Sequence, residues 1–332
     1  MPARVRRKLP VLSLVLAATA LATAGVAAAA NGGFSPQYPH SPNAARINSA
    51  YWLIFGFTTF IFVLVETLLV VFIWKYRSRG RGREVEGAQV HGHTRLELLW
   101  TAGPVVILGV IAGFVFYKLP GIANVPAASA GERVNVTVEG HQFYWLYRYP
   151  NGAVSINDLH VPVGKVTYLT IRSADVAHSY WVPQLGGKTD AIPGRTNHTW
   201  FQPDKTGVFT GQCAEFCGIF HEAMQARVTA ESEADYRAYI TKTAPATLGK
   251  QEWQGVCATC HGMQGQGDYG PAIADSPLLT QKASLVGILR NGVDTPRPGV
   301  MPPVGDTWNT TQIDALAAYV KQHVFKGATS GG

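Results

Sequence analysis

Two long apolar stretches near the N-terminus most constrain how this 332-residue chain can fold. They span about residues 51–74 and 98–117, and each reaches the roughly 20 helical residues that the hydrocarbon core of a bilayer requires. The segment between them, 75–83, is rich in Lys and Arg, and short basic loops stay on the cytoplasmic side of a membrane. The pattern predicts a two-helix transmembrane hairpin over residues 45–120, with everything after Lys118 outside the cytoplasm.

An earlier apolar stretch has a different character. Basic residues from Arg4 to Lys8 precede an apolar, Ala-rich run from Leu9 to Ala30. A basic start, an apolar middle and small residues at the end describe a secretory signal peptide, which we predict for residues 1–30. The alternative is an uncleaved first membrane helix. No cysteine directly follows the run, so a lipid-anchored N-terminus is not predicted.

The net charge of +7 is concentrated in the N-terminal third of the chain. Before residue 132, 12 Lys and Arg residues accompany 4 Asp and Glu residues, whereas 132–230 and 245–332 are each balanced. A nucleic-acid-binding protein carries its basic surface on a folded domain. Because the excess charge here belongs to the membrane segments, we predict a membrane partner and no nucleic acid.

The rest of the chain changes character twice. Residues 132–229 alternate β-branched, aromatic and polar residues between turn-forming Pro, Asn and Gly, a pattern typical of a β-sandwich. Residues 230–247 read as a short helix running into a linker. Residues 248–325 read as a small domain with helical periodicity at 311–323. We therefore expect a multidomain membrane protein with a helical hairpin, an all-β sandwich and a small all-α domain.

Soft metal ligands are concentrated in one segment of the predicted sandwich. It contains Cys213, Cys217, His221 and Met224. Thiolate and thioether groups suit copper, whereas all-oxygen sites suit magnesium or calcium. Two cysteines at this spacing can bridge two copper ions, and a second histidine is then needed, which His178 supplies from an earlier strand. A zinc site and a disulfide are the alternatives.

A second cysteine pair lies in the last domain. The run from Cys257 through Cys260 to His261 has the C-x-x-C-H pattern of c-type haem attachment, with two thioethers and a proximal histidine. Met263 is too close in sequence to reach the opposite haem face, whereas Met301 lies in a Pro-rich loop before the final helix. His/Met ligation raises the reduction potential into an electron-transfer range. We predict one covalent haem c, held by Cys257, Cys260, His261 and Met301.

The copper segment and its surroundings resemble subunit II of cytochrome c oxidase, in which a sulfur-bridged dicopper A centre lies in a cupredoxin fold. The resemblance covers about residues 45–229 and includes 97–104, 141–145 and 188–195. Residues 248–325 are similar to a class I cytochrome c throughout. The chain thus looks like an oxidase subunit II with a cytochrome c domain fused to its C-terminus.

This resemblance implies specific site residues. The dicopper ligands would be His178, Cys213, Cys217, His221, Met224 and the backbone carbonyl of Glu215. The side chain of Glu215 would also help to bind a magnesium ion shared with subunit I. Glu97 matches the family's carboxylate near the mouth of a proton channel; the alternative is a Glu favoured at a helix N-terminus by the macrodipole.

The chain departs from the family at two positions. Phe143 stands where the family usually has the Trp that receives electrons from a docked cytochrome, so a path through Phe143 and Trp145 is in question. Arg148 stands where an acidic residue is common, which makes the copper domain poorly suited to recruit a free basic cytochrome. A covalent linker would substitute by setting a high effective concentration. Glu66, in the middle of the first membrane helix, is expected to face a partner helix.

The resemblance implies the electron-input subunit of a proton-translocating cytochrome c oxidase. Electrons would pass from a donor, such as a cytochrome c or a cytochrome bc complex, through haem c and the dicopper centre to subunit I, which reduces dioxygen to water. No catalytic residue is expected here, because no membrane helix carries the His cluster that dioxygen reduction needs. Other oxidase subunits are further expected partners, in a bacterial cell membrane that the chain crosses more than once, with the copper and haem domains on its outer side. The alternatives are the copper subunit of a nitric oxide reductase and a membrane-anchored copper-binding protein.

Overall fold

The computed structural model describes residues 35–77, 89, 91–127, 133–242, 245–293 and 301–327. The predicted signal peptide and the part of the basic loop beyond Arg77 lie outside these residues. The chain divides into two compact units. One contains Ala45–Ile122, and the other contains Pro39–Ala44 together with the chain from Ala123 onward.

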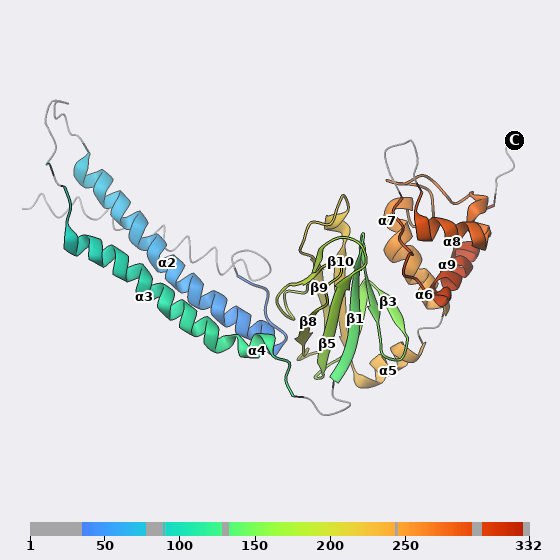
Figure 1. Ribbon diagram of the computed structural model, residues 1–332, viewed down its shortest axis with the longest axis horizontal. Coiled ribbons are helices and arrows are strands. Elements are labelled where there is room, and N and C mark those ends of the chain that lie inside the picture. The colour runs from blue at the N-terminus through green and yellow to red at the C-terminus, as the bar shows by residue number, and fades with distance from the viewer. Residues whose placement is uncertain are drawn as a thin grey trace, which may run out of the picture. The chain divides into compact units, whose positions relative to one another are not determined.

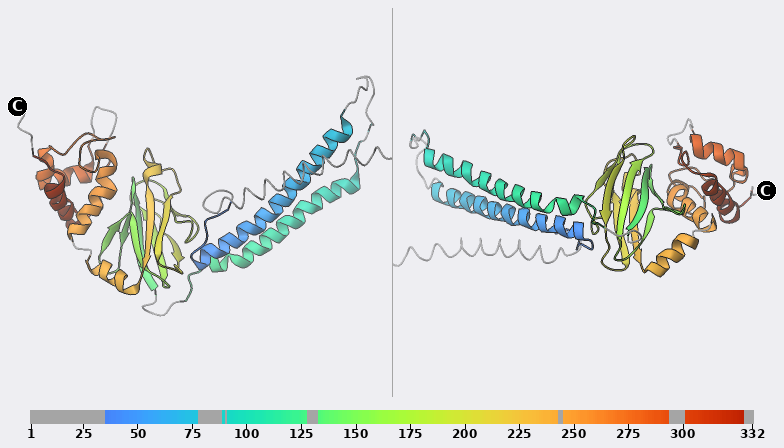
Figure 2. Two further views of the ribbon diagram at one scale, coloured as in Figure 1. Left: turned by 180° about the vertical axis from the view of Figure 1, so that it is seen from behind. Right: turned by 60° about the horizontal axis from the view of Figure 1, so that its bottom comes forward.

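Two long apolar helices make up most of the first unit. These are α2 (Pro42–Tyr76) and α3 (Thr94–Lys118), followed by the short α4 (Pro120–Ala123). Both long helices are apolar and long enough to cross a membrane, and they run alongside each other in Figures 1 and 2. Arg46 near the start of α2 donates a hydrogen bond to the carbonyl of Gly121 in α4, which ties the two ends together. A helix that is apolar on all sides suits a lipid environment.

The second unit begins with a β-sandwich of two five-stranded sheets (Figure 1). The first sheet has the order β3-β2-β1-β5-β8 and the second β4-β10-β9-β6-β7. The strands are β1 (Arg133–His141), β2 (Tyr144–Arg148), β3 (Val154–Ile156), β4 (Asp158–Pro162), β5 (Val166–Ser173), β6 (His178–Trp181), β7 (Thr189–Ala191), β8 (Asn197–Phe201), β9 (Gly207–Cys213) and β10 (Gln225–Glu231).

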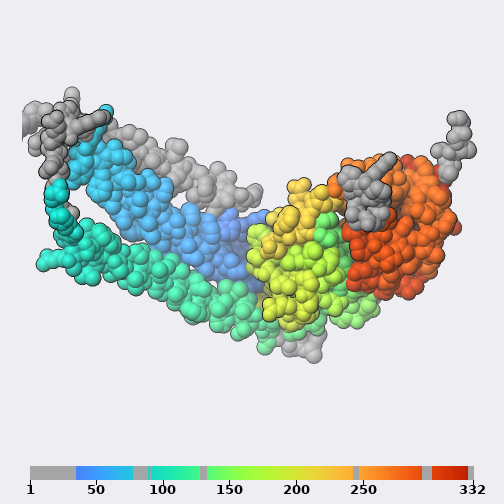
Figure 3. Space-filling model, turned by 45° about the horizontal axis from the view of Figure 1, so that its top comes forward, coloured from blue at the N-terminus to red at the C-terminus, as the bar shows by residue number. Residues whose placement is uncertain are grey.

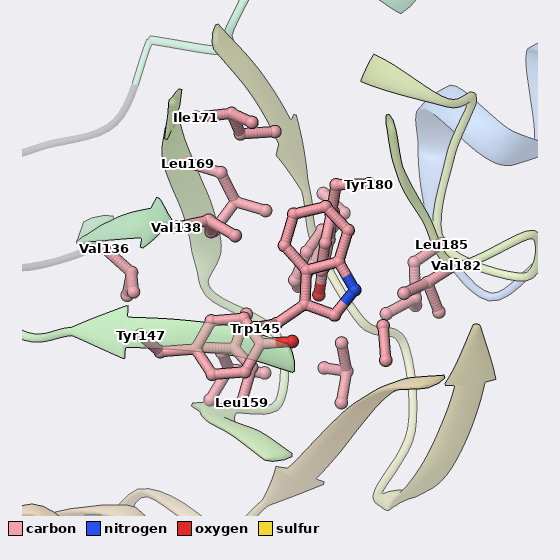
Figure 4. Packing of buried hydrophobic residues seen from close by; sticks show 14 of the residues in the cluster. Val136, Val138, Trp145, Tyr147, Leu159, Leu169, Ile171, Tyr180, Val182 and Leu185 are labelled. Atoms are coloured by element: carbon pink, nitrogen blue, oxygen red, sulfur yellow. The ribbon is translucent and has the colours of Figure 1, made fainter. Parts of the chain in front are cut away.

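The sandwich core is built by alternate residues of these strands. Trp145 and Tyr147 of β2 point inward, and Figure 4 shows them among apolar side chains of neighbouring strands. The Trp145 ring meets the Tyr180 ring edge to face, with centroids 5.1 Å apart. Tyr144 and Leu146 point to the other face of the sheet, yet they too are 0% exposed. A strand buried on both faces reads as a continuous apolar run, which explains the sequence of β2.

A small helical domain completes the second unit. It follows α5 (Glu233–Lys242) and contains α6 (Pro245–Glu252), η2 (Trp253–Cys257), α7 (Ala258–His261), η3 (Pro277–Thr280), α8 (Lys282–Asn291) and α9 (Thr310–His323). Helices α6 and α9 cross closely, because Gly249 has no Cβ to collide with the Ala315 carbonyl. Asn309 and Gln312 form a capping box that starts α9. Figure 3 shows this domain in orange and red against the sandwich in green and yellow. The predicted fold class is confirmed.

Candidate metal centre and cofactor cavity

Five of the six predicted copper ligands come together because of one strand pairing. Strands β9 and β10 are antiparallel neighbours, with Gln212 opposite Gln225. The loop between them therefore leaves the sheet at Cys213 and returns to it at Met224. The backbone N–H of Cys213 donates to the carbonyl of Met224 at 2.9 Å, which closes this loop.

The sixth ligand, His178, comes from another strand. Strand β6 pairs with β9 so that Tyr180 lies opposite Cys213, and this register brings His178 beside the loop. The ring of His178 rests against Gly140 of β1, where an added Cβ would lie 2.8 Å from the ring. Asp175 accepts a hydrogen bond from Nε2 of His178 at 2.8 Å, which orients Nδ1 towards Sγ of Cys213.

The donor atoms are close enough for one compact site. Nδ1 of His178 lies 3.9 Å from Sγ of Cys213, and Nδ1 of His221 lies 3.5 Å from Sγ of Cys217. Sδ of Met224 lies 3.8 Å from Sγ of Cys217. The carbonyl of Glu215 lies 3.2 Å from Sγ of Cys213. This set of two thiols, two imidazoles, a thioether and a carbonyl fits copper.

The two thiols differ in their acidity without a metal ion. Burial opposes ionisation of Cys213, but hydrogen bonds from His178 and the backbone lower its pKa below the ordinary value. Burial raises the pKa of Cys217 to about 12, and the neighbouring charge of Cys213 adds to the shift. Two adjacent buried thiolates need positive charge between them, which a metal ion supplies. Both cysteines are free, so they form no disulfide.

The C-x-x-C-H residues line a cavity of about 940 Å³ in the helical domain. Cofactor sites commonly have volumes of about 300–1,000 Å³. Cys257, Cys260, His261 and Met301 all lie on its walls, and both cysteines are free thiols. A second, apolar cavity of about 210 Å³ adjoins Cys257, His261 and Met301. The predicted haem ligands are thus brought together around a space suited to a flat apolar cofactor.

The orientation of His261 also suits an iron ligand. Its Nδ1 donates to the carbonyl of Pro271 at 2.8 Å, which leaves Nε2 free to bind a metal. Gly270 makes room for the ring, because an added Cβ would lie 2.9 Å from it. The backbone of Met301 is held by an antiparallel β-bridge to Val293, and Met301 lines the cavity. Met263 is 56% exposed and does not line either cavity.

Residues of the sandwich form one wall of the larger cavity, which sequence reasoning did not anticipate. They are Gln142, Phe143, Ile219 and Phe220. The Phe220 ring meets Tyr269 of the helical domain edge to face, with centroids 4.6 Å apart, and meets Phe143 at 5.5 Å. Phe143 in turn lies against Gly218, whose φ of +135° and crowded position favour glycine. The apolar residues between Cys217 and His221 were the available signal.

The remaining predicted residues lie elsewhere. Trp145 is buried in the sandwich and meets the His178 ring edge to face at 5.8 Å. Glu97 accepts a hydrogen bond from the backbone N–H of His93 at the start of α3, as a helix-capping residue does. The side chain of Glu215 is exposed. Glu66 lies in α2 and is exposed within this chain.

Comparison with known proteins finds family models that match the membrane helices, the sandwich and the helical domain. The family models described as the periplasmic and the transmembrane domain of cytochrome c oxidase subunit II match residues 153–231 and 29–117. A model described as cytochrome c oxidase, cbb3-type, subunit III matches residues 244–320. "Cytochrome c oxidase subunit 2" of Alkalihalophilus pseudofirmus is 31% identical, over 85% of this chain and 89% of that one. The chain belongs to the cytochrome c oxidase subunit II family.

Other family members are similar over shorter regions. "Cytochrome c oxidase subunit 2" of Cereibacter sphaeroides is 30% identical, over 65% of this chain and 81% of that one. The crystal structure of the periplasmic domain of subunit II from Bradyrhizobium japonicum is 33% identical, with a TM-score of 0.34 over 36% of this chain and 96% of that one.

Membership of the subunit II family confirms several predictions. The chain is a subunit of a cytochrome c oxidase, and its matched domains imply copper in the sandwich and haem in the helical domain. Two apolar helices and a match to a periplasmic domain indicate a membrane-anchored protein with the sandwich outside. Below, the sandwich is called the copper domain and the helical part the cytochrome domain.

Proposed function

We propose that this chain is the electron-input subunit of its oxidase. The cytochrome domain takes electrons from an external donor, such as a cytochrome c or a cytochrome bc complex. The copper domain passes them to subunit I, where dioxygen is reduced to water and protons are pumped. When bound, copper and haem supply the one-electron oxidation and reduction steps, and the protein holds them at fixed positions.

Two copper ions fit the donor atoms of the copper domain. Cys213 and Cys217 would hold both ions, since Cys213 lies beside His178 and Cys217 lies beside His221. The other ligands would be His178, His221, Met224 and the carbonyl of Glu215. The side chain of Glu215 is exposed and would help to bind a magnesium ion shared with subunit I.

One covalent haem c fits the cavity of the cytochrome domain. Cys257 and Cys260 would form the thioether bonds, and His261 and Met301 would be the axial ligands. Burial raises the pKa of Cys257 to about 12, so this side chain stays a neutral thiol until it reacts. A multi-pass arrangement in a bacterial membrane, with both cofactor domains on the outer side, gives these thiols access to haem attachment. Glu97 at the N-terminal end of α3 is our candidate for the proton-channel entrance.

One observation supports the proposed electron path from the haem cavity to the copper site. The cavity wall and the thiol cluster are connected through direct contacts: Tyr269 meets Phe220, Phe220 meets Phe143, and Phe143 lies against Gly218, next to Cys217. The amide of Gln142 also donates to the carbonyl of Cys217 at 2.5 Å. Phe143 thus faces the chain's own cytochrome domain, which supports an intramolecular path.

Flash reduction of the haem in the purified oxidase tests this proposal. We expect the haem to be reoxidised as the copper centre is reduced, at a rate independent of enzyme concentration. The rate should also change little with salt, because the partners are already in contact and no long-range attraction is needed. The Cys217→Ser variant should still accept an electron on the haem but should not pass it on. A rate that rises with enzyme concentration would contradict the proposal.

A further inference from the structure

We propose that Arg148 is a positioning residue that fixes the cytochrome domain on the outer face of strands β1, β2 and β3. The cytochrome domain would then be a permanent part of the electron-input site and not a mobile carrier on a free linker. This inference deepens the proposed function, on which its functional meaning rests. The contacts that support it do not depend on any bound cofactor.

The outer face of these strands is largely apolar, and it is buried. Tyr144, Leu146 and Arg148 alternate with the inward residues of β2 and therefore point away from the sandwich core. Tyr144 and Leu146 are 0% exposed because the cytochrome domain covers them. Val154 and Ile156 of β3 belong to the same apolar cluster. The cytochrome residues in this cluster include Leu248, Trp253, Val256, Ala258, Trp308 and Leu316.

Arg148 lies at the polar edge of this surface and reaches the cytochrome domain twice. Its Nη1 donates to Oε1 of Gln312, and its Nη2 donates to the carbonyl of Thr307, both at 3.3 Å. The planar guanidinium fork can serve two acceptors at once, which a lysine cannot do in the same way. Its own side chain is 24% exposed, and it lies 4.0 Å from the carboxylate of Glu139.

Glu139 anchors the same edge from β1. Its side chain is only 3% exposed, and a buried carboxylate is stable only when charged and hydrogen-bonding partners surround it. His141 and Arg172 lie within 2.8 Å and 2.7 Å of its oxygens. With Arg148 these make three groups, and a fourth comes from the cytochrome domain: the hydroxyl of Thr307 donates to Glu139 at 2.9 Å. Docking therefore completes the surroundings of a charge on the covered face of β1, where Glu139 pairs with Leu146.

Three further hydrogen bonds fix the orientation. The phenol of Tyr144 donates to the carbonyl of Val304 at 2.6 Å and accepts from Nε1 of Trp308 at 2.8 Å. Burial raises the pKa of Tyr144 well above its ordinary value, so the phenol keeps the proton that it donates. Asn157 donates to the carbonyl of Gly255 at 3.1 Å. These bonds lie at separate points of the surface, so together they oppose both sliding and rotation.

An acidic residue is common in the family at the position of Arg148. The presence of arginine here thus has a structural reason. The acceptors that meet its guanidinium, Oε1 of Gln312 and the carbonyl of Thr307, are neutral oxygens that suit a cation and not a carboxylate. The surface on which a soluble cytochrome would otherwise have to dock is occupied by the chain's own cytochrome domain.

Oxidative footprinting of the intact, cofactor-loaded oxidase tests the proposal. Hydroxyl radicals modify exposed aromatic side chains, and mass spectrometry locates each modification. Tyr144 and Trp145 are adjacent and both 0% exposed, but only Tyr144 is covered by the cytochrome domain. In Arg148→Ala we expect modification of Tyr144 to rise about tenfold, because hydrogen bonds from a charged group shift an equilibrium by that order. Modification of Trp145 should stay at the wild-type level.

Two matched variants complete the test. Arg148→Lys should give a smaller increase, since it keeps the charge but loses the fork. Arg227→Ala is the control, because Arg227 is 58% exposed and pairs only at 3.8 Å with Asp158; it should leave Tyr144 protected. If Arg148→Ala exposes both Tyr144 and Trp145, the sandwich has unfolded, and the milder Arg148→Lys must then expose Tyr144 alone.

The outcomes separate this inference from the proposed function. Wild-type protection of Tyr144 in Arg148→Ala, with the copper and haem spectra intact, would overturn the positioning role of Arg148. So would wild-type protection of Tyr144 in Arg148→Lys, if that variant has to be used. A wild-type enzyme that protects Tyr144 but passes no electron from haem to copper would overturn the proposed function and leave the positioning role standing.

Discussion

Thr307 in the cytochrome domain donates a 2.9 Å hydrogen bond to Glu139 in the copper domain. This bond joins a surface hydroxyl to a carboxylate that is almost fully buried. Burial by itself would raise the pKa of Glu139, but the hydrogen bond and charge of His141 and the charge of Arg172 outweigh it and lower the pKa to about 2. The carboxylate is therefore ionised wherever the enzyme works.

The depressed pKa of Glu139 predicts a specific pH dependence of stability. A carboxylate with a folded pKa of about 2 and an ordinary value of 4.5 stabilises the fold above pH 4.5. This contribution, on the order of 2–3 kcal/mol, is lost as the pH falls from about 4.5 towards 2. Glu139→Gln should remove this acid-dependent part of the free energy of unfolding. Denaturant unfolding followed by tryptophan fluorescence measures it.

Glu233→Gln is the matched control for Glu139. Hydrogen bonds from Arg237 and Lys165 lower the pKa of Glu233, but its side chain is 38% exposed. Exposed ion pairs contribute only about 0–1 kcal/mol, so this variant should keep most of the acid dependence. An equal loss in both variants would show that the buried position of Glu139 has no special effect.

A second buried carboxyl predicts the opposite pH dependence. Glu252 is 0% exposed, and burial raises its pKa to about 9 although Gln312 opposes the shift. Because the folded state holds this proton more tightly than the unfolded state, stability should fall as the pH rises from 4.5 to about 9. Glu252→Gln should raise the free energy of unfolding at pH 8 by about 1–3 kcal/mol. Asp314→Asn, at an exposed position of α9, should change it little, and a destabilised Glu252→Gln would contradict the argument.

Cys217→Ser is expected to abolish the mixed-valence copper signal and to leave the haem in place. A hydroxyl cannot replace a bridging thiolate as a soft ligand, and Cys217 is the residue that contacts both His221 and Met224. Electron paramagnetic resonance of the whole chain, with copper and haem content by analysis, measures both. Retention of a two-copper signal would end this ligand assignment.

Glu215→Gln separates the two roles of Glu215. The copper contact uses the backbone carbonyl, which is 3.2 Å from Sγ of Cys213 and is unchanged by the substitution. The copper signal should therefore persist, while bound magnesium or manganese in the intact oxidase should decrease because a carboxylate ligand is lost. Loss of copper in this variant would argue against ligation by the carbonyl alone.

Met301→Ala is expected to lose the sulfur-to-iron absorption band and to lower the haem potential, because the thioether favours ferrous iron. Met263→Ala is the control, since Met263 is exposed and lines neither cavity. Absorption spectroscopy and redox titration of the intact enzyme distinguish the two methionines. The same effect from Met263→Ala would require another position for the distal ligand.

The sequence by itself determined the parts of this protein whose signals are local. Apolar length identified two membrane helices, alternation identified the sandwich, and the two Cys–His segments identified the copper and haem chemistry. Each depends on residues only a few positions apart, and spacing on a strand, loop or helix largely decides what such residues can bind.

Only the tertiary structure decided which distant residues meet. The register of β6 on β9 brings His178 to Cys213, although many residues separate them. Arg148 looked like a departure that weakens recruitment of a cytochrome, yet it contacts Thr307 and Gln312 of the chain's own cytochrome domain. Tyr144 places a large aromatic ring on a face that a lone sandwich would leave open to water. These relationships follow from sheet register and domain packing. Both depend on the whole chain, so no short stretch of sequence predicts them.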